Sequence, residues 1–453
     1  MSSDDELKTS TDTICAIATP PGIGGVGIIR ISGSQSVKIA NRLTEARLEP
    51  RHAHFTCFVD EQGATLDSGI AIWFAAPASF TGEDVVELQV HGGPQVLQML
   101  LQRVMSLGAR AARPGEFSER AFLNNKLDLV QAEAIADLIE SSTAASARAA
   151  QRSLEGAFSA RVEALRNQLI ELRVFIEAAM DFPEEEIDFL ADSDVLDRLV
   201  SADKQLQSLL DEAHQGQLLR DGINIAIAGF PNAGKSSLLN VLAGRDAAIV
   251  TETPGTTRDV LREYLSLDGL PVHVADTAGI RDSDDHVEAE GVRRARAAFT
   301  AADMVLLVID QTQDTAAQLE LRKELPDNIP CIEVYNKTDL TNGKNGADKP
   351  ALKAWVSAKT GLGITDLVGL VRHVAGIRPS FDGVFSARTR HLDALRRTRG
   401  HIAAGRAQLE EFNEPETLAE ELRLAQKALG EITGEYLPDD LLGDIFSRFC
   451  IGK

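Results

Sequence analysis

The alternation of hydrophobic and polar residues near the N-terminus predicts strands. Within residues 1 to about 118, segments such as 85–90 (Val-Val-Glu-Leu-Gln-Val) place apolar side chains at every second position. Glycine clusters at 22–27 and 92–93 mark turns, and a helix is expected over 95–107. We therefore expect an α+β domain in residues 1–118.

From about residue 119 to 220 the period of the apolar positions becomes helical. Apolar side chains recur at alternating steps of three and four, which is the seam of a bundle helix. This seam consists of Val162, Leu165, Leu169, Leu172, Ile176 and Ala179. Pro183 and the acidic run 184–186 should end the helix, and a helical pattern returns over 379–453.

Between these helical stretches, residues 221–378 alternate strands with helices, as a parallel α/β sheet requires. The clearest buried strand is 304–309, which Asp310 ends. Because the termini of a compact domain often lie close together, the economical interpretation is one discontinuous helical domain, 119–220 and 379–453, with an α/β domain inserted in it. Two separate helical domains are the alternative.

Composition agrees with a large intracellular protein. A chain of 453 residues, 44% hydrophobic, should split into about three domains. It shows no apolar run near the roughly 20 residues of a membrane helix and no signal peptide, so we expect a cytoplasmic protein without a membrane anchor. Its four cysteines lie far apart, which favours free thiols. The net charge of −22 argues against non-specific nucleic-acid binding.

The first candidate for chemistry is a phosphate loop, Gly229-Phe-Pro-Asn-Ala-Gly-Lys235-Ser236. Its glycines let backbone N–H groups surround phosphates, and the following helix adds its positive N-terminal end. Lys235 should reach the β- and γ-phosphates in a catalytic role, and Ser236 should ligate Mg²⁺.

The tetrapeptide Asn336-Lys337-Thr338-Asp339 selects the base. A carboxylate here can accept two parallel hydrogen bonds from N1–H and the exocyclic amine of guanine, a donor pair that adenine lacks. Asp276-Thr277-Ala278-Gly279 lies between the two motifs. Three motifs in this order, each at a strand end, predict GTP binding.

Further contacts are expected around the γ-phosphate and the base. In the polar loop 251–259, Thr257 can complete the magnesium shell, and Asp276 can hold a magnesium-bound water. Ser357-Ala358-Lys359 should give backbone contacts to the guanine carbonyl, although an ordinary loop is the alternative. The predicted GTP contacts are Asn232, Ala233, Gly234, Lys235, Ser236, Ser237, Thr251, Glu252, Thr253, Pro254, Gly255, Thr256, Thr257, Asp276, Thr277, Ala278, Gly279, Asn336, Lys337, Thr338, Asp339, Ser357, Ala358 and Lys359.

One expected residue is missing. Ile280 follows Gly279, where a Ras-like GTPase carries a water-orienting glutamine, so hydrolysis must recruit another group. An acidic loop follows at 282–290, and by itself it is typical of a solvated face.

The chain resembles the tRNA-modification GTPase family called MnmE or TrmE over nearly its whole length. The motifs that support this resemblance are Ala18-Thr-Pro-Pro-Gly22, Gly24-Gly-Val-Gly-Ile-Ile-Arg30, Phe80-Thr-Gly-Glu-Asp84, His91-Gly-Gly-Pro94, Arg113-Pro-Gly-Glu-Phe-Ser-Glu-Arg-Ala-Phe122 and the terminal Phe449-Cys-Ile-Gly-Lys453. The sequence departs from the family pattern at Pro254 in the switch loop.

The resemblance implies a homodimer that acts with a flavin-dependent partner of the MnmG type. The pair would attach a one-carbon-derived (carboxymethyl)aminomethyl group to the wobble uridine of certain tRNAs. It also implies 5-formyltetrahydrofolate, or a related one-carbon tetrahydrofolate, in the N-terminal domain. The folate residues it assigns are Arg30, Glu87, Lys126 and Lys453. From the pattern alone, Glu87 is simply a solvated strand residue.

The resemblance further implies that K⁺ accelerates hydrolysis and that Glu288 orients the attacking water in place of Ile280. Asn232 stands where the family has a K⁺ ligand, although it could merely stabilise the loop turn. Oxygens of Thr251, Thr253 and Thr256 would complete the K⁺ shell.

Competing interpretations concern the whole protein and its C-terminus. A GTPase switch that binds ribosomal RNA or assembling ribosomes would need no folate, and a catalytically dead scaffold would not need intact Lys235 and Ser236. Cys450-Ile-Gly-Lys453 is a poor prenylation box, so the final helix should pack instead, with Cys450 near the one-carbon group or simply buried. The arginines of 293–296 and 388–399 favour solvated faces over RNA contacts.

Overall fold

The fold is taken from a computed structural model, which describes residues 12–44, 46–181, 193–244, 262–276, 299–341, 344–378, 380–436, 439–447, 449 and 452. The chain forms two compact units. One comprises 1–136 with 429–453, and the other comprises 137–428. The last helix, 439–447, therefore belongs to the unit of the N-terminal sheet. The division predicted from the sequence, three domains with the helical domain in two parts, stays a proposal.

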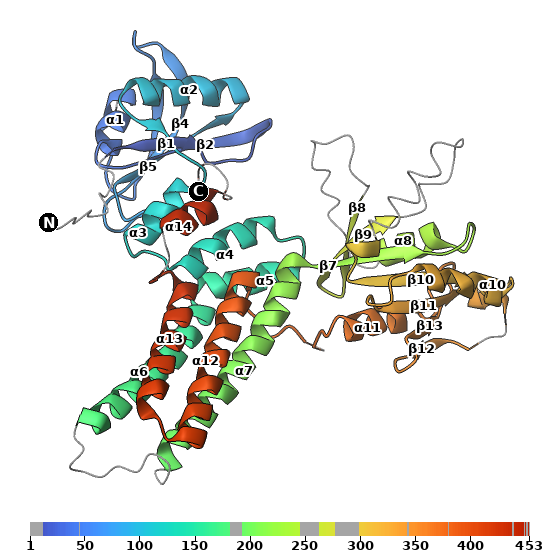
Figure 1. The fold of residues 1–453 in the computed structure, drawn as a ribbon. Helices are drawn as coiled ribbons and strands as arrows, with labels where there is room; N and C mark the ends of the chain where they lie inside the picture. Colours follow the sequence, from blue (N-terminus) through green and yellow to red (C-terminus); the bar gives the residue numbers. More distant parts are fainter. Residues whose placement is uncertain are drawn as a thin grey trace. The chain divides into compact units, whose positions relative to one another are not determined.

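The first unit is built on a mixed sheet with two helices against it (Figure 1). Its described strands follow the order β3-β4-β5-β2-β1-β6. The bounds are β1 Ile14–Ile17, β2 Gly24–Ser32, β3 Ala53–Val59, β4 Thr65–Phe74, β5 Val85–Gly92, β6 Arg110–Ala111, α1 Ser36–Leu43, α2 Pro94–Ser106 and α3 Glu116–Leu123. The alternating strand predicted over 85–90 and the helix predicted over 95–107 are confirmed as β5 and α2.

The core of this domain follows from the alternation. Val86, Leu88 and Val90 of β5 are buried together with Leu97 and Leu100 of α2. Because successive strand residues point to opposite faces, Glu87 lies on the face away from this core. Arg30 of β2 pairs with Glu87 in the register, so two of the candidate folate residues lie together there.

The C-terminal segment folds back onto the same unit. Helix α14 (Asp439–Ser447) buries Phe446, and Phe449 follows it into a cluster with Leu129 and Ala132. Gly452 has φ +94°, and a Cβ there would approach Ile17 O to 2.5 Å. Only glycine fits this position, so Gly452 lies directly against β1.

The second unit contains long helices that pack side by side and an α/β domain (Figure 1). Its helices are α5 Ala144–Leu154, α6 Ala157–Asp181, α7 Ser193–Asp221 and α12 Thr389–Phe412, while α4 Leu129–Glu140 and α13 Pro415–Thr433 each belong partly to both units. The seam predicted for α6 is confirmed, since its apolar positions from Val162 to Ile176 are buried and Ala179 is half-buried. Pro183 and the run 184–186 lie outside the described residues.

Helices from before and after the α/β domain share one core. Phe158 stacks on Phe385 with ring centroids 4.4 Å apart, and Gln426 Nε2 donates to Leu169 O at 3.0 Å, the length of an ordinary amide hydrogen bond. Helix α7 packs against α12. The helical domain is therefore discontinuous, and the alternative of two separate helical domains is wrong.

The inserted domain is a mostly parallel sheet in the order β12-β13-β11-β10-β7-β9-β8, counted over the described strands. Its bounds are β7 Ile223–Ala228, α8 Lys235–Ala243, β8 Arg262–Leu267, β9 Leu270–Asp276, β10 Met304–Asp310, α10 Thr315–Leu319, η3 Glu320–Glu324, β11 Cys331–Asn336, η4 Thr338–Leu340, β12 Gly346–Asp348, β13 Lys353–Trp355 and α11 Ile364–Val374. All of β10 is buried, because helices cover both faces of a parallel sheet. This explains the continuous apolar run of 304–309.

One buried carboxylate ties the helical domain together where the α/β domain enters and leaves it. Asp137, 4% exposed, accepts from Arg220 Nε at 2.8 Å, Ser386 Oγ at 2.7 Å and Arg388 Nη2 at 2.6 Å. Arg220 precedes β7, whereas Ser386 and Arg388 follow the α/β domain in sequence.

Among the helices that the structure describes, none is long and apolar enough to cross a membrane.

Candidate functional site: a nucleotide site and an arginine–glutamate pair

The phosphate loop connects β7 to α8 and depends on two glycines. Gly229 has φ +148°, and a Cβ there would approach Val308 O to 2.4 Å. Gly234 has φ +94° and would bring a Cβ within 2.3 Å of Asn336 Nδ2. Between them, Asn232 adopts a left-handed φ of 61°. The loop therefore needs glycine at both positions, because a side chain at either one would collide with β10 or with Asn336.

Lys235 and the first turn of α8 line this loop. Lys235 Nζ donates to Gly229 O at 2.9 Å and to Phe230 O at 3.0 Å, so the ammonium lies over the loop that should hold phosphate. Ser236 and Ser237 are exposed in the first helical turn, where backbone N–H groups are unpaired within the helix. The end of the helix can therefore accept an anion.

Asn336 joins three segments of the nucleotide site. Its side chain is buried, donates from Nδ2 to Ala233 O at 2.9 Å and accepts at Oδ1 from Ala358 N at 3.0 Å. The phosphate loop, the tetrapeptide and the 357–359 stretch are thus brought together by one amide. A buried amide that loses a partner costs about 1–3 kcal/mol, so this arrangement is firmly held.

The carboxylate of Asp339, which is predicted to read the base, is hydrogen-bonded to a buried serine. Ser357 Oγ donates to Asp339 Oδ1 at 2.7 Å and accepts from Thr360 N at 3.1 Å. Asp339 itself is exposed, as is Lys359, so both can meet a ligand. Lys337 begins the η4 turn with a left-handed φ of 66°, and Thr338 is buried.

Most of the remaining predicted nucleotide and K⁺ residues lie outside the part of the chain that the structure describes. Asp276 ends β9, but nothing is described of its side chain. Predicted site residues outside the described residues are Thr251, Glu252, Thr253, Pro254, Gly255, Thr256, Thr257, Thr277, Ala278, Gly279, Glu288 and Lys453.

A second candidate site lies on the first unit, where Arg30 of β2 is opposite Glu87 of β5 in the antiparallel register. Arg30 donates from Nε at 3.0 Å and from Nη2 at 2.8 Å to one oxygen, Glu87 Oε1. Its Nη1 donates to Gly452 O at 3.3 Å, and its guanidinium lies 5.4 Å from the centre of the Phe80 ring. A cation, a carboxylate and an aromatic ring thus meet beside the chain terminus.

Lys126 belongs to the edge of this region. It is exposed, and its Nζ donates to Pro77 O at 3.1 Å, in the loop that also carries Phe80. The structure therefore brings Arg30 and Glu87 into contact with each other and places Lys126 against the neighbouring loop.

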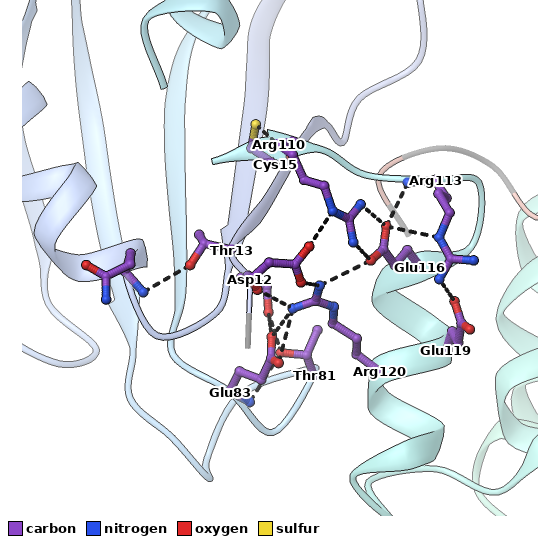
Figure 2. Close-up of polar contacts among 12 residues, drawn as sticks. Asp12, Thr13, Cys15, Thr81, Glu83, Arg110, Arg113, Glu116, Glu119 and Arg120 are labelled. Atoms are coloured by element: carbon purple, nitrogen blue, oxygen red, sulfur yellow. Dashed lines mark hydrogen bonds and ion pairs between the residues drawn. The ribbon is translucent and has the colours of Figure 1, made fainter. Parts of the chain in front are cut away.

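Next to this site is an ion-pair network that sequence reasoning missed. Figure 2 shows Arg110 and Arg120 both directed at Asp12 and Glu116. Arg120 also contacts Glu83 at 3.1 Å, and Glu83 accepts from Ser32 Oγ of β2 at 2.7 Å. The i,i+4 spacing of Glu116 and Arg120 was the available signal, because such pairs face one another on a helix.

Glu116 is the central anion of this network. It is 2% exposed, and burial by itself would raise its pKa. Hydrogen bonds from Arg110, the Arg113 N–H and Arg120 outweigh burial and lower the pKa of Glu116 from 4.5 to about 2. The network therefore holds a charged carboxylate inside the domain at neutral pH.

The fold and the nucleotide site together define a class, the P-loop GTP-binding proteins, with the nucleotide domain inserted in a helical domain. Comparison with known families narrows this class. The MnmE helical domain family matches residues 129–450, and the family described as GTP-binding protein TrmE N-terminus matches 13–126. The chain belongs to the MnmE (TrmE) family.

Relatives match over the full length. The "tRNA modification GTPase MnmE" of Pseudomonas paraeruginosa (strain DSM 24068 / PA7) is 54% identical over 455 residues, covering 99% of this chain and 100% of the relative. The protein of the same name from Methylococcus capsulatus (strain ATCC 33009 / NCIMB 11132 / Bath) is 55% identical, covering 98% of this chain and 99% of the relative.

The Glu116 network predicts an acid-sensitive N-terminal domain. Because folding lowers the pKa of Glu116, its stabilisation is complete above pH 4.5 and is lost as the pH falls toward 2. This pKa shift corresponds to about 3 kcal/mol of the free energy of unfolding, and Glu116→Gln should remove most of that stabilisation at pH 7. Urea unfolding can be followed by Trp73 fluorescence in a Trp355→Phe background, since these are the two tryptophans of the chain.

Glu119→Gln is the matched control on the same helix. Glu119 pairs with Arg113, whose side chain is 64% exposed, so this change should cost no more than about 1 kcal/mol. The role of Glu116 would be contradicted if the two variants lost equal free energy of unfolding. It would also be contradicted if the free energy of unfolding of the unaltered protein did not change between pH 4.5 and 2.

Proposed function

We propose that this protein hydrolyses GTP and acts in tRNA modification. The observation that carries the proposal is the position of Asn336, which joins the phosphate loop to the stretch beside the base-reading Asp339. A carboxylate held in this way suits guanine and gives adenine no donor pair to match. Relatives that cover 98–99% of the chain are named as tRNA modification GTPases, which supports the same activity for this chain.

For hydrolysis, we assign the phosphate contacts to the loop N–H groups and to Lys235. Ser236 and Thr257 would hold Mg²⁺, which neutralises charge on the β- and γ-phosphates when bound. The exposed position of Ser236 on the first turn of α8 fits such a ligand. Asn232 fits a K⁺ ligand because it is exposed in the loop and carries a side-chain carbonyl oxygen, and Thr251, Thr253 and Thr256 would add further oxygens.

Hydrolysis should depend on Glu288, which we propose orients the attacking water. Glu288→Ala should leave GTP affinity nearly intact and slow steady-state phosphate release by roughly 10²-fold or more, the scale of a lost orienting group. Hydrolysis should also be faster in K⁺ than in Na⁺ at equal ionic strength, and Asn232→Ala should abolish that difference.

Glu290→Ala, a neighbouring carboxylate, is the control and should turn over like the unaltered protein. If Glu288→Ala hydrolyses GTP within a factor of two of the unaltered rate, Glu288 does not orient the attacking water. Equal rates in the two salts for the unaltered protein would end the potassium proposal.

We propose that the nucleoside modified in tRNA is the wobble uridine. A homodimer of this chain, acting with a flavin-dependent partner, would attach a one-carbon-derived aminomethyl-type group to it. The tRNA function of the relatives and the one-carbon chemistry suited to the Arg30–Glu87 site support this together.

Nucleoside analysis of tRNA tests the proposed product. Cells that lack this protein should lose the aminomethyl-type wobble uridines, and a copy of the gene should restore them. The Lys235→Ala copy serves as the matched control and should not restore them, because the amine over the phosphate loop is missing. Unchanged wobble uridines in the deletion strain would refute the proposal.

For the one-carbon donor we propose 5-formyltetrahydrofolate at the Arg30–Glu87 pair. These residues fit a folate. A carboxylate matches the aminopyrimidinone edge of the pterin, and cations suit the glutamate tail of the folate. Glu87 uses one oxygen, Oε1, for Arg30. Phe80 adds an aromatic face beside the pair, and Lys126 and Lys453 would supply cations.

Calorimetry with 5-formyltetrahydrofolate tests this site. Arg30→Ala should weaken binding at least about tenfold, the scale of one lost charge-assisted hydrogen bond, while GTP hydrolysis continues. Arg42→Ala, on the exposed surface of α1 in the same unit, should bind as the unaltered protein does. Unchanged affinity in Arg30→Ala would exclude this pair from the site.

A further inference from the structure

Asp310 is a buried carboxylate beside the nucleotide site that the proposed chemistry does not use. It ends β10 and lies opposite Asn336 in the parallel register with β11. The residue is 2% exposed. An ionised group so deeply buried is costly unless it is fully partnered, so its contacts indicate what it is kept for.

The backbone and one carboxylate oxygen of Asp310 are held by their own segment. Gln318, itself buried, accepts from Asp310 N at 2.8 Å and donates to Asp310 O at 3.0 Å. Thr312 donates to Oδ1 from its N–H at 2.9 Å and from Oγ1 at 2.7 Å. The side chain is therefore fixed in one orientation before any ligand is considered.

The other oxygen, Oδ2, is directed at Lys337. Lys337 Nζ donates to it at 2.6 Å, and the lysine side chain remains 30% exposed. Burial opposes ionisation of Asp310, but the hydrogen bonds from Lys337 and Thr312 outweigh it and hold its pKa below the ordinary range. The pair thus joins a fixed anion to a lysine of the tetrapeptide that selects the base.

Pairing at Nζ has a consequence for the rest of the lysine. A lysine whose ammonium is tied down presents its four-carbon stem as an apolar strip, and a flat purine can cover such a strip. Lys337 lies two residues before Asp339, which would read the edge of the same base. Fixing the stem in advance removes rotamer freedom that would otherwise be lost on binding.

We propose that Asp310 is a positioning residue for guanine binding, which holds the stem of Lys337 as one wall of the base site. It contacts Lys337 and acts through that residue. The inference rests on the proposed function, since it assumes that the tetrapeptide binds guanine. It predicts an effect on stacking of the base without an effect on recognition of its edge.

The test measures the affinities of the full-length protein for GDP and inosine diphosphate by calorimetry. Inosine diphosphate keeps the phosphates and the flat ring but lacks the exocyclic amine that Asp339 would bind. Asp310→Asn should weaken both ligands about tenfold and leave their ratio unchanged, whereas Asp339→Asn should change the ratio. Combined with Lys337→Met, Asp310→Asn should add no further loss, because both changes remove one interaction.

Glu320→Gln is the matched control, since it removes a carboxylate paired with Lys323 on the exposed surface of the same segment. It should bind GDP as the unaltered protein does. Should Asp310→Asn unfold, Thr312→Val keeps the ion pair, removes one support of Asp310, and should weaken both ligands about threefold at a constant ratio.

GDP affinity of a folded Asp310→Asn within twofold of the unaltered protein would overturn the inference. So would additive losses in the double variant, or a changed ratio between the two ligands. Failure of the unaltered protein to prefer GDP over ADP would instead refute the guanine site itself, so the two failures are distinguishable.

Discussion

The second unit depends on the burial of one carboxylate, Asp137, among partners from two other stretches of the chain. Arg220 reaches it at the point where the chain enters the α/β domain, and Ser386 and Arg388 reach it after the chain leaves. Removing one partner of such a buried pair typically costs about 3–5 kcal/mol, because the other charge is left uncompensated. This carboxylate therefore closes the helical domain around its insertion.

The same region gives the nucleotide domain a direct contact with the helices. The turn between β8 and β9 presents Gly269 O to Thr143 Oγ1 at 2.9 Å, at the N-terminus of α5. Strand β9 leads to Asp276 at the candidate γ-phosphate site, and β8 follows the predicted switch loop. A movement of either strand would therefore act on a helix cap, where a satisfied hydrogen bond contributes about 1 kcal/mol.

Local patterns were sufficient for several elements. The continuous apolar run of β10 comes from burial on both faces, and the alternation of β5 comes from burial on one face. The phosphate loop could be predicted residue by residue, because Gly229 and Gly234 need conformations that other residues rarely adopt. Each of these signals arises within one short segment, so no knowledge of distant residues was needed.

The sequence by itself determined the elements, the nucleotide motifs and the resemblance to the MnmE family. Only the tertiary structure decided which charges meet: Arg30 with Glu87, Glu116 with Arg110, Lys337 with Asp310. The last pair is separated by 27 positions and the first by 57, and neither follows a periodic pattern. Ion pairing depends on distances of a few ångströms between side chains that the fold brings together, and a linear pattern of charges does not contain those distances.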